Sequence, residues 1–398
     1  MATASEYPRR PHPLEWVEEE LCRLESSGLR RFRRLRSTRQ GAIITLDGRA
    51  VINFGSNDYL GLSTHPEVIA AAFAAAKEFG WGSGASALVC GYTSIHQQLE
   101  ADLARFHQTE AALVFGSGYA ANVGTVTSLV GPGDVVYMDS RNHASLWDGC
   151  RLSRADIRLF DHHDLTTLHK ELQKRGRYRR ALVVTDAVFS IEGDLAPLEG
   201  LVRLCREYEA ILLVDEAHAV GIFGPQGEGL SAELALHGEV SLRIGTLSKA
   251  LGSVGGYLVG PQKVIDLVIS KARSLIFSTA SPPAAAAAAR KALELIRANP
   301  SSGRELLRRA EKLRQHLTSA GWKLSPSCSQ IISIILGEPD RALTLTEMLL
   351  TEGIFCPAMR PPTVPEGHSC LRISLTLAHT EAMLEKLTLA LGQCGAKN

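Results

Sequence analysis

The chain has 398 residues and a net charge of +1, which offers no general attraction to nucleic acid or to acidic membranes. With 45% hydrophobic and 21% charged residues, it has the composition of a globular protein long enough for two or more domains. Its eight cysteines include no C-x-x-C pair and no secretory signal precedes them, so we expect a cytoplasmic protein with free thiols rather than a zinc ribbon or a disulfide framework.

Residues 1–57 are predicted to form an N-terminal helix and hairpin segment. Apolar residues recur at helical spacing between Trp16 and Leu24. An arginine cluster follows at residues 30–39, which is either a solvated basic face or an anion site for a phosphate-bearing substrate such as an acyl-coenzyme A. Two short apolar runs, at 43–46 and 51–54, are separated by Asp47-Gly48 and predict a hairpin.

Residues 58–290 are predicted to form the large domain. Helices are expected at 66–79 and 94–106, and between them the small residues 82–86 would let the backbone approach a ligand closely. Short apolar runs at 112–115, 135–138, 181–185 and 211–214 then alternate with helical patterns. This alternation predicts a mainly parallel sheet with helices on both faces.

Residues 291–398 are predicted to form a small α+β domain. The long helix that leads into it begins at Ser281-Pro282-Pro283 and is ended by Asn299-Pro300. Beyond it, the pattern predicts a helix near 304–317, strands at 331–336 and 371–375, and a last helix from Glu381.

One lysine lies in an unusual setting, within the sequence SLRIGTLSKALGSVGGYLVG at 241–260. Lys249 follows a short apolar run, has Thr246 and Ser248 beside it, and precedes three close-packed glycines. Such a setting suits a buried amine with phosphate-binding hydroxyls, as a Schiff-base lysine needs. On this pattern alone, a lysine exposed on a loop remains the alternative.

A carboxylate and a histidine end another predicted strand, in the sequence VDEAH at 214–218. Ligands bind at the carboxyl ends of strands in doubly wound sheets. Asp215 could therefore face a cationic ring nitrogen, with His218 near a phenolate oxygen. A helix N-cap followed by a surface histidine is the alternative.

The sequence GSGYAA at 116–121 follows a strand and opens a helix. By letter it fits the dinucleotide fingerprint, with Asp139 at a suitable distance, and this would make the protein a nucleotide-binding oxidoreductase. The physical content of the motif is a helix N-terminus that can bind a phosphate, which need not belong to a dinucleotide.

Three further histidines stand out. His143, in the sequence NHAS at 142–145, could stack on an aromatic cofactor or belong to an ordinary loop. The pair His162-His163 lies between Asp161 and Asp164 and hints at a metal, but no third ligand follows at a useful spacing. We therefore predict a strand-to-helix loop with Asp164 as its N-cap, and no metal site.

Four spaced motifs together resemble the α-oxoamine synthases, which are pyridoxal-phosphate enzymes of the aspartate-aminotransferase fold. They are NDYLGL at 57–62, NHAS at 142–145, DEAH at 215–218 and GTLSK at 245–249. The resemblance runs from about residue 28 to the last helix. It implies an α/β protein of fold type I, with a large, mainly parallel sheet domain and a small α+β C-terminal domain, assembled as a homodimer.

The resemblance also implies roles around pyridoxal phosphate. Lys249 would hold the cofactor as a Schiff base and move protons at the substrate carbon, Asp215 would keep the pyridine nitrogen protonated, and His143 would stack over the ring. The other implied contacts are His218 and Ser190 at the ring hydroxyl, Gly118, Tyr119 and Thr246 at the phosphate, and Ser278 and Thr279 reaching the cofactor of the neighbouring subunit.

For the substrates, the resemblance implies that Asn57 and Arg372 bind the carboxylate of an amino acid, for which a planar guanidinium is suited. Arg31 and Thr363 fall at positions for the acyl substrate, with Arg30 as a possible substitute for Arg31.

The sequences RPPTVP at 360–365 and LRIS at 371–374 are similar to one branch of the family. That branch condenses L-alanine with a pimeloyl thioester of coenzyme A or acyl carrier protein, giving 8-amino-7-oxononanoate for biotin synthesis. The 5-aminolevulinate synthases usually carry an Arg-Asn pair where this chain has Leu88-Val89, which disfavours a small acidic acyl partner. Condensation of glycine with acetyl-coenzyme A, or of serine with a long-chain acyl-coenzyme A, is the alternative.

Overall fold

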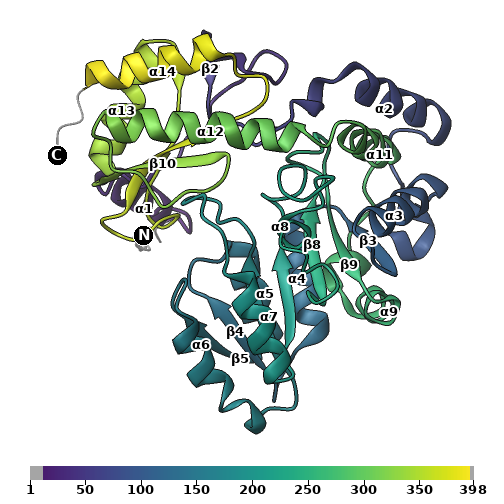
Figure 1. Cartoon of the computed structure of the whole chain (residues 1–398). Helices are drawn as coiled ribbons and strands as arrows, with labels where there is room; N and C mark the ends of the chain where they lie inside the picture. Colours follow the sequence, from purple (N-terminus) through teal and green to yellow (C-terminus); the bar gives the residue numbers. More distant parts are fainter. Residues whose placement is uncertain (1–11, 395–398) are drawn as a thin grey trace, which may run out of the picture.

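The structure, a computed structural model, describes residues 12–394 and is built around a seven-stranded sheet (Figure 1). The strand order is β3-β9-β8-β7-β6-β4-β5, in which β9 runs antiparallel to both neighbours and the other pairs are parallel. The strands are β3 (Ala111–Phe115), β4 (Val135–Asp139), β5 (Asp156–Phe160), β6 (Ala181–Asp186), β7 (Ile211–Asp215), β8 (Leu242–Thr246) and β9 (Gly256–Gly260). The predicted mainly parallel sheet is confirmed.

Alternate residues of the central strands enter two separate cores. Val136 and Val184 belong to one core, whereas Val135 and Val183 belong to the other, as expected for strands covered on both faces. The first core includes residues of α4 (Gly118–Leu129), α5 (Ala144–Ser153), α9 (Gln262–Lys271) and α10 (Arg273–Ile276). The second includes residues of α6 (Leu165–Leu172) and α7 (Leu198–Glu207).

Three helices cover the sheet beside β3 and β9. They are α2 (Pro66–Phe79), α3 (Ser94–Phe106) and α11 (Pro283–Ala298), and α11 packs against both of the others. Pro66 begins α2, and Gly80 ends it with a φ of 84°, a conformation that favours glycine. Shorter helical segments are Leu62–Thr64, Ala87–Gly91, Arg175–Arg177 and α8 (Leu230–Glu233).

The C-terminal part forms a smaller antiparallel sheet with its own helices. Its strand order is β10-β13-β12, from β10 (Ile331–Gly337), β12 (Ala358–Met359) and β13 (Ser369–Ser374). The helices are α12 (Ser302–Ser319), α13 (Pro339–Thr351) and α14 (Glu381–Cys394), which lie together in Figure 1. No helix in the described part of the chain is long and apolar enough to cross a membrane.

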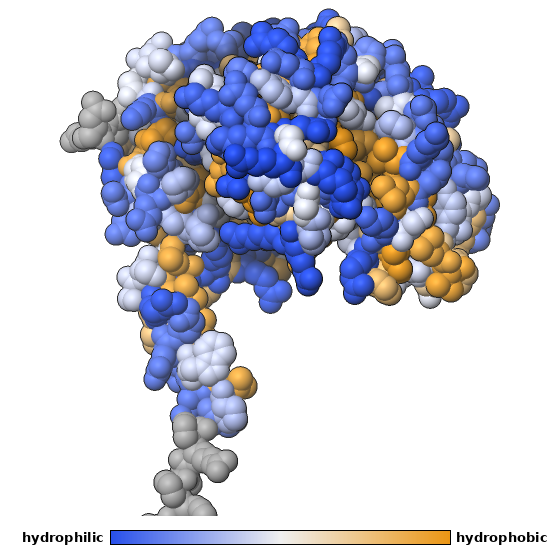
Figure 2. Space-filling model, turned by 90° about the horizontal axis from the view of Figure 1, so that it is seen from below, coloured by the Kyte–Doolittle hydropathy of each residue, from blue (hydrophilic) through white to orange (hydrophobic). Residues whose placement is uncertain are grey.

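The N-terminal hairpin joins this C-terminal part. Its strands β1 (Ile43–Leu46) and β2 (Arg49–Asn53) form a three-stranded sheet with β11 (Ile354–Phe355). In this sheet β11 pairs with β2 in parallel. The preceding helix α1 (Trp16–Ser26) buries none of its residues, and it stands off the body of the molecule (Figure 2).

Several elements were not predicted. The strand β5 contains the charged residues Asp156 and Arg158, because it lies at the edge of the sheet and is largely exposed. Helices α9 and α13 were not predicted either, nor were the short elements α8, α10, β11 and β12. The predicted division of the chain near residue 290 falls inside α11, and the domain limits stay a prediction.

Candidate active site

Lys249 lies just after β8, at the edge of the sheet where the parallel strands end. Its side chain is partly buried, and its Nζ donates a hydrogen bond to His218 Nε2 at 2.8 Å. Burial lowers the pKa of the Lys249 amine to about 8, against the opposing effect of Asp215. A cavity of about 190 Å³ opens beside it. Six other residues singled out in the sequence line this cavity, namely Gly118, Tyr119, His143, Asp215, His218 and Thr246.

Asp215 ends β7 as a buried carboxylate with only 5% of its surface exposed. Its Oδ2 accepts a hydrogen bond from Asn122 Nδ2 at 2.7 Å, and its Oδ1 accepts one from the backbone of Ala217 at 2.9 Å. Asn122 also donates to Ser145 Oγ, which lies 2.7 Å from His143 Nδ1. The carboxylate and the His143 ring are therefore held by one hydrogen-bonded chain.

Neither Asn122 nor Ser145 was assigned a role from the sequence. Asn122 lies in an otherwise apolar stretch of α4, and a buried asparagine there is the signal that could have found it.

A second carboxyl group, Asp186, lines the same cavity from the end of β6. Burial and the charge of Asp215 raise the pKa of Asp186 well above its usual value. Its Oδ2 accepts a hydrogen bond from the backbone N–H of His143 at 2.7 Å. Sequence reasoning missed Asp186, although it ends an apolar strand as Asp215 does.

A second chain of hydrogen bonds leads from Lys249 toward the C-terminal part of the protein. His218 Nδ1 lies 2.5 Å from Tyr59 Oη, which donates to Asn57 Oδ1 at 3.2 Å. Arg372 Nη2 donates to the same Asn57 oxygen, also at 3.2 Å. Burial and the nearby charge of Lys249 hold the pKa of His218 well below its usual value, so that a neutral imidazole accepts from the lysine.

The fully buried Tyr59 hydroxyl connects the two ends of this chain, and no role was predicted for it. Replacing Tyr59 by phenylalanine is expected to lower the free energy of unfolding by about 1–3 kcal/mol, because His218 Nδ1 and Asn57 Oδ1 each lose a buried partner. Denaturant unfolding measures this change.

The matched control is Tyr178→Phe, which removes an exposed hydroxyl bonded to Asp156 and should change stability by less than about 0.5 kcal/mol. Equal effects of the two substitutions would show that the buried chain contributes nothing to stability.

The N-terminus of α4 also lines the cavity, through Gly118 and Tyr119. Ser117 Oγ accepts from the Ala120 N–H at 3.0 Å, whereas the N–H groups of Gly118 and Tyr119 have no partner within the helix. A Cβ at Gly256 would lie 2.5 Å from the Gly118 Cα, so the glycine permits this close approach of β9. Thr246 lies beside Gly118. The arrangement suits a phosphate group.

The remaining predicted residues lie in three places. Arg31 Nη2 donates to Thr363 Oγ1 at 3.2 Å, which brings the two predicted acyl-substrate residues together, while Arg30 is paired with Glu25. The Ser190 carbonyl accepts from Arg372 Nε at 2.6 Å.

Ser278 and Thr279 are not among the residues that line the Lys249 cavity. They line a separate cavity of about 260 Å³ together with Leu88 and Leu275.

The sequence of residues 49–391 matches the model of class I and II aminotransferases. The chain belongs to this family. Among curated relatives, an 8-amino-7-oxononanoate synthase from Geobacter sulfurreducens is 45% identical, with 95% of this chain and 97% of that protein covered. Another, from Anaeromyxobacter dehalogenans, is 46% identical, with 95% of each chain covered.

Solved structures show the same fold over nearly the whole chain. Serine palmitoyltransferase from Sphingomonas wittichii superposes with a TM-score of 0.90 at 32% identity, covering 96% of each chain. The enzyme from S. paucimobilis, solved with a pyridoxal phosphate–myriocin aldimine, gives 0.90 at 31% identity, with the same coverage. An 8-amino-7-oxononanoate synthase from Francisella tularensis gives 0.75 at 26% identity, covering 86% of this chain and 97% of that one. The fold type I architecture expected from the sequence is confirmed.

Proposed function

We propose that this protein is a pyridoxal-phosphate-dependent acyltransferase that condenses L-alanine with a pimeloyl thioester. The products would be 8-amino-7-oxononanoate, carbon dioxide and the free thiol of coenzyme A or acyl carrier protein, as a step of biotin biosynthesis. The observation that carries the proposal is the identity of 45–46% to curated 8-amino-7-oxononanoate synthases over almost the full length of both chains. The serine palmitoyltransferases share the backbone closely but only 31–32% of the sequence.

The residues around the cavity fit pyridoxal phosphate in their chemistry. They provide the partly buried Lys249 amine with a lowered pKa, the buried Asp215 carboxylate, two histidines, and a helix N-terminus that can bind the phosphate. When bound, the cofactor supplies a carbonyl carbon that reacts with an amine and a ring that accepts electron density from the substrate.

Lys249 would accept the proton from the α-carbon of the amino acid and later return one. Its pKa of about 8 leaves a useful fraction of the amine neutral near physiological pH, and His218 orients it through the 2.8 Å hydrogen bond. Asp215 is held by hydrogen bonds from Asn122 and from the Ala217 backbone. Its negative charge would stabilise the protonated form of the ring nitrogen. His143 would lie over the ring, fixed by Ser145.

The remaining contacts are proposed for the cofactor and the substrates. His218 and Ser190 would lie near the ring hydroxyl, and Gly118, Tyr119 and Thr246 would bind the phosphate. Asn57 and Arg372 would bind the alanine carboxylate, and Arg31 with Thr363 would contact the acyl substrate; the pairing of Arg30 with Glu25 favours Arg31 for this role.

The proposal includes a homodimer in the reducing cytoplasm. Ser278 and Thr279 would contact the cofactor of the neighbouring subunit, since neither lines the cavity of its own Lys249. Several large apolar side chains are exposed in the single chain, including Phe277 beside Ser278 at 72%, Val89 at 78% and Trp81 at 77%. Figure 2 shows apolar side chains gathered on the side of the molecule where α2, α3 and α9 lie. All eight cysteines are unpaired, as expected for a protein in a reducing compartment.

A substrate panel tests the proposed reaction. Purified protein is assayed with alanine, glycine and serine against pimeloyl-, acetyl- and palmitoyl-coenzyme A, and thiol release is followed. Alanine with pimeloyl-coenzyme A is expected to have the highest kcat/KM, roughly 10-fold or more above glycine with the same thioester, because a pocket that fits one methyl group discriminates by about that factor. Faster turnover of glycine with acetyl-coenzyme A, or of serine with palmitoyl-coenzyme A, would replace the assignment.

A further inference from the structure

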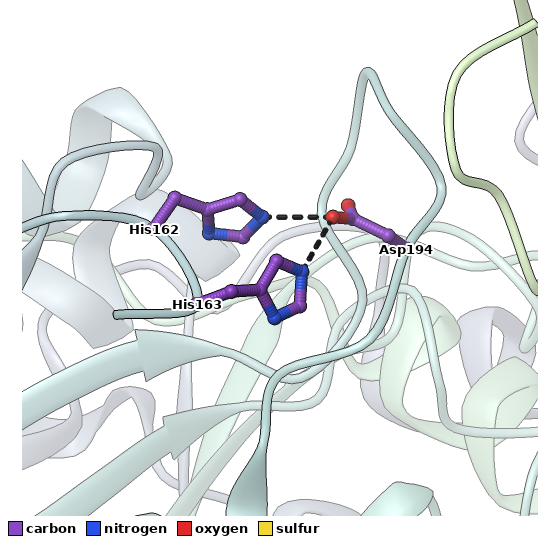
Figure 3. A group of neighbouring side chains, drawn as sticks. All are labelled: His162, His163 and Asp194. Carbon is purple, nitrogen blue, oxygen red and sulfur yellow. Dashed lines mark hydrogen bonds and ion pairs between the residues drawn. The ribbon is translucent and has the colours of Figure 1, made fainter. Parts of the chain in front are cut away.

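A histidine pair and an aspartate that is distant in the sequence meet outside the Lys249 cavity. His162 and His163 follow β5, and Asp194 lies in the loop between β6 and α7 (Figure 3). The Nε2 atoms of His162 and His163 lie 2.8 and 2.9 Å from the same oxygen, Asp194 Oδ2. One ligand atom from each residue lies within 4.8 Å of the others. The sequence showed the histidine pair, but the third residue comes from another loop.

A second carboxylate orients His162. Asp139 Oδ2 lies 3.0 Å from His162 Nδ1, on the side of the ring away from Asp194. A histidine that ligates a metal through one nitrogen usually donates its other N–H to a carboxylate or a carbonyl group, and Asp139 supplies that partner. Phe189 packs edge-on against the His162 ring, with a centroid separation of 4.2 Å.

Asp194 has a polar atom that its surroundings leave unpaired. The residue is only 3% exposed, and its Oδ1 is buried without a hydrogen-bond partner among the described residues. Buried carboxylate oxygens are nearly always paired in folded proteins, so the Asp194 carboxylate has room for one more partner, such as a water or an ion. The His163 side chain is 44% exposed and gives access from solvent.

We propose that His162, His163 and Asp194 bind one divalent ion of the Zn²⁺ class, with water in the fourth position. Two imidazole nitrogens and one carboxylate oxygen suit a borderline-soft ion better than Mg²⁺ or Ca²⁺. Bonds of about 2.0–2.2 Å place tetrahedral ligand atoms roughly 3.3 Å apart. The present contacts of 2.8 and 2.9 Å would therefore widen by about 0.5 Å. A rotation of the exposed His163 ring would widen the second contact, and a shift of the Asp194 carboxylate would widen the first.

The ion would have a structural role. It would join the end of β5, where the two histidines lie, to the loop after β6, which carries both Asp194 and Ser190. Within that loop the Asp194 carbonyl accepts a hydrogen bond from the Phe189 N–H. This site stands independently of the proposed function, because none of its three residues lines the Lys249 cavity.

The test is a calorimetric titration of the reduced, cofactor-loaded protein with Zn²⁺, compared with His163→Asn. His163 has a φ of 63°, a conformation in which asparagine is well tolerated, so this variant should fold normally. The native protein is expected to bind one equivalent at this site, and the variant to bind it at least roughly 10-fold more weakly. The variant also leaves the contacts of His162 with Asp139 and Asp194 in place.

The matched control is His368→Asn, which removes an exposed histidine whose Nδ1 contacts only the Glu366 carbonyl. It should keep the full zinc affinity, and Mg²⁺ should give no binding heat at this site. Absence of a zinc event in the native protein, or an unchanged event in His163→Asn, would overturn the proposal. Equal binding of Mg²⁺ and Zn²⁺ would overturn the assignment to a borderline-soft ion.

Discussion

Replacing Lys249 by alanine is expected to lower the rate of condensation by roughly 10⁴-fold or more, the size of loss seen when a reacting group is removed from an enzyme. The amine is the group that would attach the cofactor and move the α-proton, and its partner His218 has a pKa held well below the usual value. A neutral, fully buried imidazole could not take over the role of the amine. Steady-state and single-turnover assays with alanine and pimeloyl-coenzyme A measure the loss.

The matched control for this substitution is Lys271→Ala. Lys271 Nζ donates to the Ser128 carbonyl at 2.8 Å, at the end of α9 and outside the cavity, and its removal should leave kcat within about 3-fold of the native value. The circular dichroism of both variants should match that of the native protein. Undiminished turnover by Lys249→Ala would remove the chemical basis of the proposed function.

Replacing Asp215 by asparagine is expected to lower kcat by roughly 10²–10³-fold, the range for the loss of one preorganised electrostatic contact. The substitution keeps the size of the side chain, and an amide oxygen can still accept from Asn122 or from the Ala217 N–H. What it removes is the negative charge that would stabilise a protonated ring nitrogen. The loss should therefore appear mainly in kcat, with a KM for alanine that changes much less.

Asp186→Asn provides the comparison, because both aspartates are buried at the ends of neighbouring strands. Burial and the charge of Asp215 raise the pKa of Asp186 well above its usual value, so an uncharged amide should disturb this position less than it disturbs Asp215. Its amide oxygen can still accept from the His143 N–H. We expect a change in kcat of less than about 10-fold. A larger loss for Asp186→Asn than for Asp215→Asn would show that the charges are assigned to the wrong carboxylates.

Much of the fold was predictable because its strands are short buried runs between clear helix signals. The runs at 181–185 and 211–214 became β6 and β7 almost residue for residue, and Pro66 and Gly80 marked both ends of α2. Where burial is partial the signal fails, as in β5, whose Asp156 and Arg158 face solvent at the sheet edge. The pairing of β2 with β11 joins segments about 300 residues apart in the sequence, and no local pattern predicts it.

The candidate site shows the same limit. Lys249, Asp215, His218 and His143 could be singled out because each follows a strand in a motif of recognisable chemistry, and the structure brings them to one cavity. The residues that support them were not assigned roles. Asn122 lies within α4, outside the four motifs. Ser145 and Tyr59 stand in the NHAS and NDYLGL motifs, but the sequence does not show that their hydroxyls contact His143 and His218.

The His162 cluster also depends on a contact between segments that are distant in the sequence. The acidic residues nearest to the pair in the sequence are Asp161 and Asp164, and Asp164 does cap α6 as predicted. The carboxylate that meets both rings is Asp194, which follows the next strand and reaches the pair through the fold.

The most direct test of the central claim is the identity of the residue that carries the cofactor. Protein purified with pyridoxal phosphate would be reduced with borohydride, digested and analysed by mass spectrometry. One pyridoxyl group per chain is expected, on the peptide that contains Lys249, and none in the Lys249→Ala protein. Modification of another lysine, or retention of the label after Lys249 is replaced, would contradict it.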